Sequence, residues 1–118
     1  MVAYNFKAQF ADDVASGKKW QTIRRNRRAK VGDPLQLYTG MRTKGCRKLR
    51  DAVCTAVYEV TIKSRGYYLA VRLNGDLLPT ESARELALAD GFESLPAFAD
   101  FFAQQYGLPF RGYLTRWE

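Results

Sequence analysis

The segment from Ala52 to Lys63 constrains the fold of this chain more than any other part of its sequence. Two sets of side chains alternate along it, so that one set would face each side of an extended strand. The first set is Val53, Thr55, Val57, Glu59 and Thr61, and the second is Cys54, Ala56, Tyr58, Val60 and Ile62. β-Branched residues favour a pleated, half-buried surface. We therefore predict a long strand over residues 52–63.

The rest of the chain divides into short strands and helices separated by turn residues. Period-two alternation predicts strands over residues 4–7, 20–25, 35–39, 67–73 and 110–117. Helical spacing of apolar residues predicts helices over residues 8–16, 80–89 and 95–106, and basic loops over residues 26–30 and 40–51. We predict one domain, residues 1–118, of the α+β class and mainly β. It would be a small β-barrel of five to six mostly antiparallel strands with about three helices.

Individual residues mark where the helices begin and end. Gly17 follows the first helix and is a natural stop. Ser82 and Glu85 have the spacing of a capping box in the second helix, and Ser94 is a candidate N-cap for the third. Asn74 and the glycine after it predict a tight turn between two strands.

Charge is distributed unevenly along the chain. Residues 1–50 contain 13 Lys and Arg against 3 acids, whereas residues 51–118 contain 6 against 9, which together give the net charge of +7. The stretch from Lys18 to Lys30 alone carries seven cations and no acid. Clustering of this kind predicts a cationic face and a polyanionic partner such as RNA, or a nucleotide.

The residue types that are absent exclude several functions. The chain has no His, which removes Ser-His-Asp catalysis, Cys-His catalysis and His-containing zinc sites. Its two cysteines, Cys46 and Cys54, are too few for a structural zinc site, and reduced thiols are the expectation for a cytoplasmic protein. No apolar run approaches the roughly 20 residues of a membrane span. We expect no metal, no cofactor and no membrane contact.

Two segments resemble the ASCH domain family. The first is Gly-Lys-Lys-X-X-Thr-Ile-Arg at residues 17–24, followed by Val-Gly-Asp at residues 31–33 and a Leu-X-Leu-Tyr strand at residues 35–38. The second is Ala-Asp-Gly-Phe at residues 89–92, followed by Ser94 and a Phe-rich helix. The resemblance covers nearly the whole chain. It implies a PUA-like β-barrel and the binding of RNA or nucleotides in a cleft beside the first segment.

One branch of that family is similar to small bacterial enzymes that remove the acetyl group from N4-acetylcytidine. The catalytic Lys and Thr of that branch fall on Lys19 and Thr22. The catalytic Glu falls on or near Asp90, with Glu93 close by. Asp is one methylene shorter than Glu, so its carboxylate would lie about 1 Å further back, and misplacement of that size can cost about 10²-fold in rate.

Amide hydrolysis requires a nucleophile, a base and a group that stabilises an oxyanion. Thr22 would be the nucleophile, and Lys19 its base if burial or nearby cations lower the Lys19 pKa. Arg24 would add cationic density, or hold the oxyanion or a phosphate. Asp90 would orient Lys19 or handle the proton of the leaving amine. Because residues 19 and 22 face opposite sides of a regular strand, this set requires a bend near Lys19.

A binding function would use the same cleft without catalysis. Five basic residues would contact phosphates, and two aromatic residues would stack on bases: Lys19, Arg24, Arg25, Arg27 and Arg28, with Trp20 and Tyr38. Trp20 also has the alternative of an ordinary core residue. Each residue of the catalytic set likewise has an ordinary structural alternative, Thr22 as a favourable strand residue and Asp90 as a solvated one.

Three functions follow, in order of preference. The first is an ASCH-domain protein that binds RNA, or a nucleotide or modified nucleoside, in a basic cleft. The second is an N4-acetylcytidine-type amidohydrolase that uses Lys19, Thr22 and an acid near Asp90. The third is a ribonuclease, for which the sequence offers no clustered carboxylates, since Asp12 and Asp13 are far in sequence from Asp90.

Overall fold

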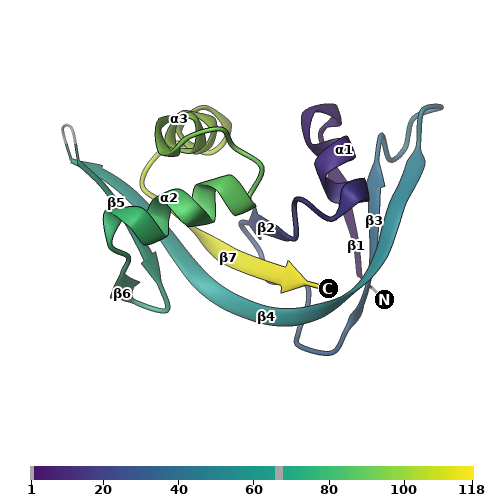
Figure 1. Cartoon of the computed structure of the whole chain (residues 1–118), viewed down its shortest axis with the longest axis horizontal. Helices are drawn as coiled ribbons and strands as arrows, with labels where there is room; N and C mark the ends of the chain where they lie inside the picture. Colours follow the sequence, from purple (N-terminus) through teal and green to yellow (C-terminus); the bar gives the residue numbers. More distant parts are fainter. Residues whose placement is uncertain (1, 66–67) are drawn as a thin grey trace.

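The computed structural model describes residues 2–65 and 68–118 of the chain (Figure 1). The strands within these ranges are β1 Val2–Phe6, β2 Gln21–Arg24, β3 Pro34–Thr39, β4 Arg47–Arg65, β5 Tyr68–Leu73, β6 Asp76–Leu77 and β7 Phe110–Trp117. The helices within the same ranges are α1 Ala8–Ser16, α2 Thr80–Ala89 and α3 Leu95–Gln105. The prediction of an α+β fold that is mainly β, with about three helices, is confirmed. The described residues form seven strands, where five to six were predicted.

Strand β4 is the long element around which the sheet is arranged (Figure 1). Its first part pairs with β3, which in turn pairs with β1, while its second part pairs with β7 and β5. Strand β7 also pairs with β2, and β5 pairs with the short β6. The pairing of β1 with β3 is parallel, and the other described pairings are antiparallel. The predicted antiparallel character therefore holds with one exception.

The sheet is open, so the closure of a barrel is not confirmed. Among the described residues no ladder joins β1 to β2, and the two strands remain separate edges of the sheet. Arg24 of β2 bridges them instead, since its Nη2 donates a hydrogen bond of 2.7 Å to the carbonyl oxygen of Asn5 in β1. A side chain thus stands where a closed barrel would have a backbone ladder. We call this gap between β1 and β2 the seam.

The predicted helices over residues 8–16 and 80–89 are confirmed, and the third ends one residue earlier than predicted. The predicted strand over 67–73 begins at a residue outside the described ranges, and β5 is described from Tyr68. The prediction of a loop over residues 40–51 is wrong for its last part, because β4 already begins at Arg47. Strand β3 draws this basic segment into the sheet, with Thr39 opposite Arg47 and Leu37 opposite Arg50.

The expected helix signals hold in two of three cases. Gly17 caps α1 with φ 86°, and its N–H donates to the Val14 carbonyl oxygen at 3.2 Å. The Ser94 Oγ accepts a 3.1 Å hydrogen bond from the Ala97 N–H at the start of α3. The capping box at Ser82 is wrong, because α2 begins two residues earlier, at Thr80, and Ser82 already lies inside the helix.

The predicted turn at Asn74 and the next glycine is confirmed, with φ values of 50° and 86° that suit a tight hairpin.

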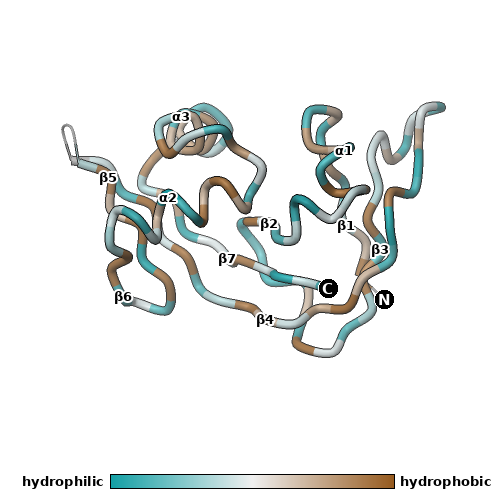
Figure 2. Tube along the Cα trace, viewed as in Figure 1, coloured by the Kyte–Doolittle hydropathy of each residue, from teal (hydrophilic) through white to brown (hydrophobic). Residues whose placement is uncertain are grey.

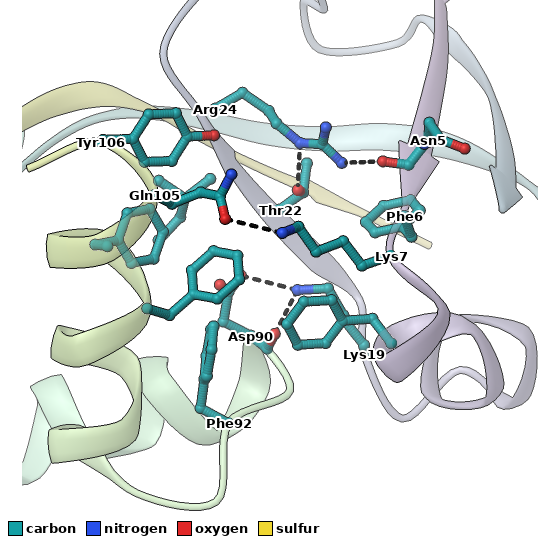
Figure 3. A pocket seen from close by; sticks show the side chains of 14 residues that line it. Asn5, Phe6, Lys7, Lys19, Thr22, Arg24, Asp90, Phe92, Gln105 and Tyr106 are labelled. Carbon is teal, nitrogen blue, oxygen red and sulfur yellow. Dashed lines mark hydrogen bonds and ion pairs between the residues drawn. The ribbon is translucent and has the colours of Figure 1, made fainter. Parts of the chain in front are cut away.

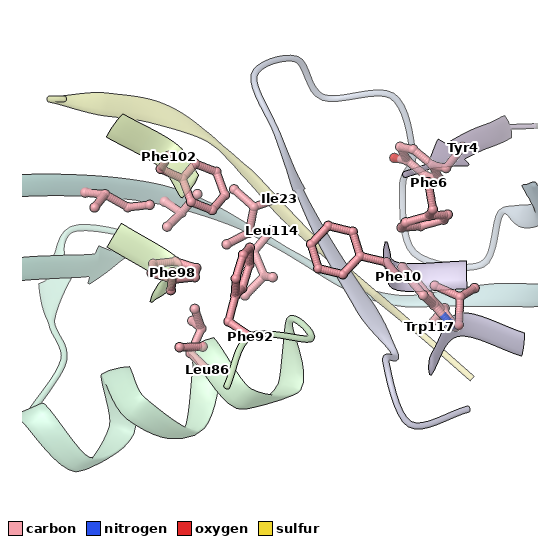
Figure 4. Packing of buried hydrophobic residues seen from close by; sticks show 14 of the residues in the cluster. Tyr4, Phe6, Phe10, Ile23, Leu86, Phe92, Phe98, Phe102, Leu114 and Trp117 are labelled. Carbon is pink, nitrogen blue, oxygen red and sulfur yellow. The ribbon is translucent and has the colours of Figure 1, made fainter. Parts of the chain in front are cut away.

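The core joins the sheet to all three helices, which lie on one side of β4 in Figure 1. In Figure 2 the trace of β4 carries hydrophobic stretches between hydrophilic ones, and Ala52, Cys54, Val60 and Ile62 of this strand are buried. Phe98 and Phe102 of α3 are buried, and Phe92 lies edge-on to Phe98 at 5.5 Å between ring centroids (Figure 4). Phe10 of α1 contacts the Phe92 ring at 5.3 Å, so this aromatic pair connects α1 to the α2–α3 side of the molecule. None of the helices in the described ranges is long and apolar enough to cross a membrane.

Gly112 of β7 provides a test of the packing between β2 and β7. A Cβ at this position would overlap the Arg24 carbonyl oxygen and the Phe110 ring, so we expect Gly112→Ala to lower the free energy of unfolding. Overpacking of this kind typically costs about 1–3 kcal/mol. A Cβ at Gly45 would meet only the Thr43 Oγ1 at 3.7 Å, so Gly45→Ala is the matched control. Urea denaturation of both variants measures the difference, and equal stabilities would contradict the expected overlap.

Candidate functional site

A cavity of about 260 Å³ lies at the seam (Figure 3). Strands β1 and β2, helices α1 and α3, and the segment after α2 all contribute to its lining. The lining residues are Asn5, Phe6, Lys7, Phe10, Lys19, Thr22, Ile23, Arg24, Asp90, Phe92, Phe101, Phe102, Gln105 and Tyr106. The three residues predicted to be catalytic are all among them. The walls are largely aromatic, and the polar side chains come from β2 and the segment before it, and also from Asn5, Lys7, Asp90 and Gln105.

Lys19 lies in the cavity because the chain turns inward after α1. Gly17 ends the helix in a left-handed conformation, and the Lys19 N–H then donates a 2.9 Å hydrogen bond to the Asp13 carbonyl oxygen. Only 3% of Lys19 is exposed. Its ammonium lies 4.9 Å from the centroid of the Phe10 ring, within the range of a cation–π contact. A buried amine with an aromatic face beside it requires a counter-charge.

Asp90 supplies that counter-charge. Its Oδ1 lies 3.1 Å from the Lys19 Nζ, and its backbone carbonyl oxygen accepts a hydrogen bond from the same amine. The residue ends α2, and Gly91 follows it with φ 95°, a left-handed conformation that suits glycine. Asp90 is 4% exposed, whereas Glu93 is exposed to solvent. The acid opposite Lys19 is therefore Asp90, and its short side chain reaches the amine.

Burial acts against both charges of this pair. Desolvation lowers the pKa of Lys19 below its ordinary 10.5, while the attraction of Asp90 and its hydrogen bond oppose that shift. Desolvation also raises the pKa of Asp90 above its ordinary 3.8, opposed by Lys19 and by a hydrogen bond from Gln21. Arg24 adds a repulsion that lowers the Lys19 pKa further. The cavity thus favours a neutral amine more than water does.

Thr22 and Arg24 occupy the same face of β2, two residues apart. The Arg24 Nε donates a 2.9 Å hydrogen bond to the Thr22 Oγ1, which leaves the threonine hydroxyl proton available. Strand β2 begins only at Gln21, so Lys19 is not part of the regular strand. The bend that the sequence required is present, and Lys19 and Thr22 line the same cavity. The hydrogen bonds made by the described residues do not include one between these two side chains.

The two aromatic residues predicted to stack on bases lie elsewhere. Trp20 is 39% exposed and packs against Arg116, whose guanidinium carbon lies 5.0 Å from the Trp20 ring centroid. Tyr38 is half-buried in β3, and its hydroxyl donates to the Gln36 Oε1 at 3.3 Å. Neither lines the cavity.

Three of the predicted phosphate-binding arginines are exposed and also lie outside the cavity lining. The Arg25 guanidinium carbon lies 5.3 Å from the ring centroid of Tyr106, which itself lines the cavity. Arg28 lies 5.1 Å from the ring centroid of Tyr4, and the Arg27 Nε donates to the Ala29 carbonyl oxygen at 3.3 Å. Arg24 is thus the one cation of the 24–28 stretch that lines the cavity.

Several residues that line the cavity have no local signal in the sequence. Lys7 and Gln105 are 98 positions apart, and the Lys7 Nζ donates a 2.8 Å hydrogen bond to the Gln105 Oε1 (Figure 3). This contact joins α3 to Lys7, the residue between β1 and α1, and both side chains are exposed. Phe101 and Tyr106 fall within the predicted helix over residues 95–106, and nothing in that helical pattern indicates that they face a cavity. No local pattern indicates contacts across such a separation.

Metal ligands are not grouped in the parts of the chain that the structure describes. No set of three or more His, Cys, Asp or Glu side chains in residues 2–65 and 68–118 is placed to hold a metal ion. Cys46 is exposed and Cys54 is buried, and both are free thiols.

The fold and the cavity define an α+β protein whose open sheet holds a small aromatic-walled cavity around a buried Lys–Asp pair. No family model, curated protein or solved structure matches the chain. The resemblance to ASCH domains therefore stays a prediction from the sequence.

Proposed function

We propose that this chain is an ASCH-domain protein with an opened PUA-like barrel, and that its cavity binds one nucleoside unit. The unit would be a free nucleotide or modified nucleoside, or a single base of an RNA. The proposal keeps the cytoplasmic location expected from the cysteine content. The observation that carries it is the combination of aromatic walls with a polar, cationic interior in one small cavity.

The cavity has the features that recognition of a base requires. Phe10, Phe92, Phe101 and Tyr106 supply aromatic surface, and bases stack on such side chains. Arg24 supplies donors for a base carbonyl or a phosphate. The volume of about 260 Å³ is near the lower end of the range of roughly 300–1,000 Å³ that is usual for ligand pockets. This size suits one nucleoside and not a longer stretch of RNA.

Calorimetric titration with cytidine, N4-acetylcytidine and cytidine monophosphate tests the binding. Phe101 is a half-buried wall residue, and stacking on an aromatic side chain contributes about 1–3 kcal/mol per base. We therefore expect Phe101→Leu to weaken binding about fivefold or more. Tyr68 is 57% exposed on β5 and does not line the cavity, so Tyr68→Leu is the control.

Three other outcomes would redirect the proposal. Absence of binding at millimolar nucleoside would remove the nucleoside cavity as a function. Binding only to RNA, with an affinity that falls steeply with salt, would show that phosphate contacts dominate. Cleavage of that RNA during the titration would instead support the ribonuclease.

We also propose a second function, amide hydrolysis on an N4-acyl cytidine, because one specific observation favours it. Asp90 is 71 positions from Lys19 in the chain, and both residues line the same cavity as Thr22. The lowered pKa of Lys19 suits a general base, which must be neutral to accept a proton. Arg24 contacts the Thr22 Oγ1 and so stands beside the atom where negative charge would develop.

The residues suggest the following sequence of steps. The Thr22 Oγ attacks the acyl carbonyl carbon, and the hydroxyl proton passes to the neutral Lys19 amine. The carbon–nitrogen bond then breaks, and the leaving exocyclic amine takes the proton from Lys19, which leaves an acyl ester on Thr22. Water hydrolyses this ester to release the carboxylic acid and restore the hydroxyl. Asp90 holds Lys19 in position and favours its protonated form between the two proton transfers.

A further inference from the structure

Gln21 is a buried polar side chain directly behind the candidate site. It is fully buried, and it does not line the cavity. Its Nε2 donates hydrogen bonds to the Asp90 Oδ1 at 3.2 Å and to the Leu86 carbonyl oxygen at 3.3 Å. A buried amide that binds a carboxylate of the site has a position from which it can act on the chemistry without touching a ligand.

The orientation of the Gln21 amide is fixed by Arg116. The Arg116 Nε donates to the Gln21 Oε1 at 3.3 Å. Because arginine has donors and no acceptor, the oxygen end of the amide must face Arg116 and the NH₂ end must face Asp90. The two residues are register partners in the β2–β7 ladder, so the backbone also holds them opposite each other.

Arg116 is in turn held by two aromatic rings. Its guanidinium carbon lies 5.0 Å from the Trp20 ring centroid and 5.4 Å from that of Tyr58. Arginine stacks well on aromatic faces. This gives Trp20 a role other than base stacking. A continuous set of contacts therefore runs from the outer surface at Trp20, through Arg116 and Gln21, to Asp90 and Lys19.

We propose that Gln21 is a positioning residue, which fixes the rotation of the Asp90 carboxylate so that its Oδ1 pairs with the Lys19 amine. The carboxylate oxygen that accepts from Gln21 is the same one that pairs with Lys19. Without the amide, the short Asp90 side chain would have no fixed donor behind it and could rotate away from Lys19. This inference rests on the hydrolytic half of the proposed function for its kinetic consequence, but not for its structural one.

The first arm of the test is structural and uses Gln21→Met, which keeps the length of the side chain and removes both ends of the amide. The titration of the Asp90 carboxyl is followed by ¹³C NMR and assigned with Asp90→Asn. The charges that face this carboxyl are Lys19 and Arg24. Loss of a donor to the charged form should raise the Asp90 pKa in Gln21→Met. Gln36→Met, the same change on β3 outside the cavity lining, should leave it unaltered.

The second arm is kinetic and uses hydrolysis of N4-acetylcytidine. A misplaced carboxylate should lower kcat by roughly 10- to 100-fold in Gln21→Met. KM should change little, because Gln21 does not line the cavity. If Gln21 had only a structural role, Gln21→Met would lower the free energy of unfolding without lowering kcat at an unchanged KM.

The outcomes separate the positioning role from the proposed function. If the wild-type protein does not hydrolyse the amide, the hydrolytic function fails, and the Asp90 titration still decides the positioning role. If the Asp90 titration is the same in Gln21→Met and wild type, the positioning role is overturned even when the wild type is active. Should Gln21→Met not fold, Arg116→Met decides, because it frees the amide to turn and should raise the Asp90 pKa by a smaller amount.

Discussion

Replacing Asp90 by Asn should lower the free energy of unfolding by about 3 kcal/mol, because removal of one partner leaves a buried charge uncompensated. Lys19→Met should have an effect of similar size, since it leaves the Asp90 carboxylate buried without its cation. The double variant should recover most of the loss, because two buried ions are then replaced by two neutral side chains of similar volume. Urea denaturation of the four proteins forms a double-mutant cycle.

The two single variants should depend on pH in opposite directions. In Asp90→Asn, the folded-state pKa of Lys19 stays below its ordinary 10.5, so the unfolded chain binds more protons between these two values. Stability should therefore rise with pH across that interval. In Lys19→Met, the folded-state pKa of Asp90 stays above its ordinary 3.8, so the folded chain binds more protons in the interval above 3.8. Stability should therefore fall as the pH rises through that interval.

A surface ion pair provides the control for these variants. Arg84 and Glu81 are 3.0 Å apart with side chains 55% and 75% exposed, and such pairs contribute about 0.5 kcal/mol or less. Glu81→Gln should accordingly have little effect at any pH in the series. Parallel pH profiles for Asp90→Asn and Lys19→Met would contradict the assignment of Lys19 and Asp90 as a buried pair.

Replacing Thr22 by Val should reduce turnover of N4-acetylcytidine by at least about 10²-fold, because the substitution keeps the shape of the side chain and removes the nucleophilic oxygen. Thr22→Ser should retain turnover. Lys19→Met should cause a loss of similar size, since the attack then has no base. Chromatography for released cytidine measures each rate.

In the wild type the rate should rise with pH and level off near the lowered Lys19 pKa, because the neutral amine is the active form.

Two neighbouring residues are matched controls for this experiment. Thr115 is a buried threonine directly opposite Thr22 in the β2–β7 ladder, and it does not line the cavity. Lys18 is exposed and precedes Lys19. Thr115→Val and Lys18→Met should both keep turnover near the wild-type rate. Full turnover in Thr22→Val would remove Thr22 as the nucleophile, and no turnover by the wild type would leave binding as the proposed function.

Local signals in the sequence predicted the elements better than their assembly. Gly17 and Ser94 mark helix ends through backbone conformation and a side-chain cap, which depend only on neighbouring residues. The start of β4 at Arg47 depends on pairing with β3, and the open seam depends on a hydrogen bond from Arg24 to Asn5. Neither contact leaves a periodic pattern in the sequence.

The candidate site likewise depends on contacts between distant parts of the chain, which local sequence signals do not predict. Lys19, Thr22 and Asp90 could be named because a family resemblance placed them together, although no spacing rule does so. Charge density alone was a poor guide, since an arginine at the surface and one in the cavity look alike in sequence. Gln21 and Arg116 are 95 positions apart, and their contact becomes visible only when β2 lies beside β7.

Strand β4 also has a mechanical consequence for the site. One continuous strand carries β3 and β1 on its first part and β7, with β2, on its second part. The strands on both sides of the seam are therefore attached to the same strand, β4. The register shift between Cys54 and Ala56 lies where pairing with β3 ends and pairing with β7 begins. Because both sides of the seam are attached to this one strand, the curvature of β4 (Figure 1) affects the distance between β1 and β2. A ligand that fills the cavity would hold β1 and β2 apart. Residues of β4 that are distant from the cavity would therefore also affect how well a ligand fits there.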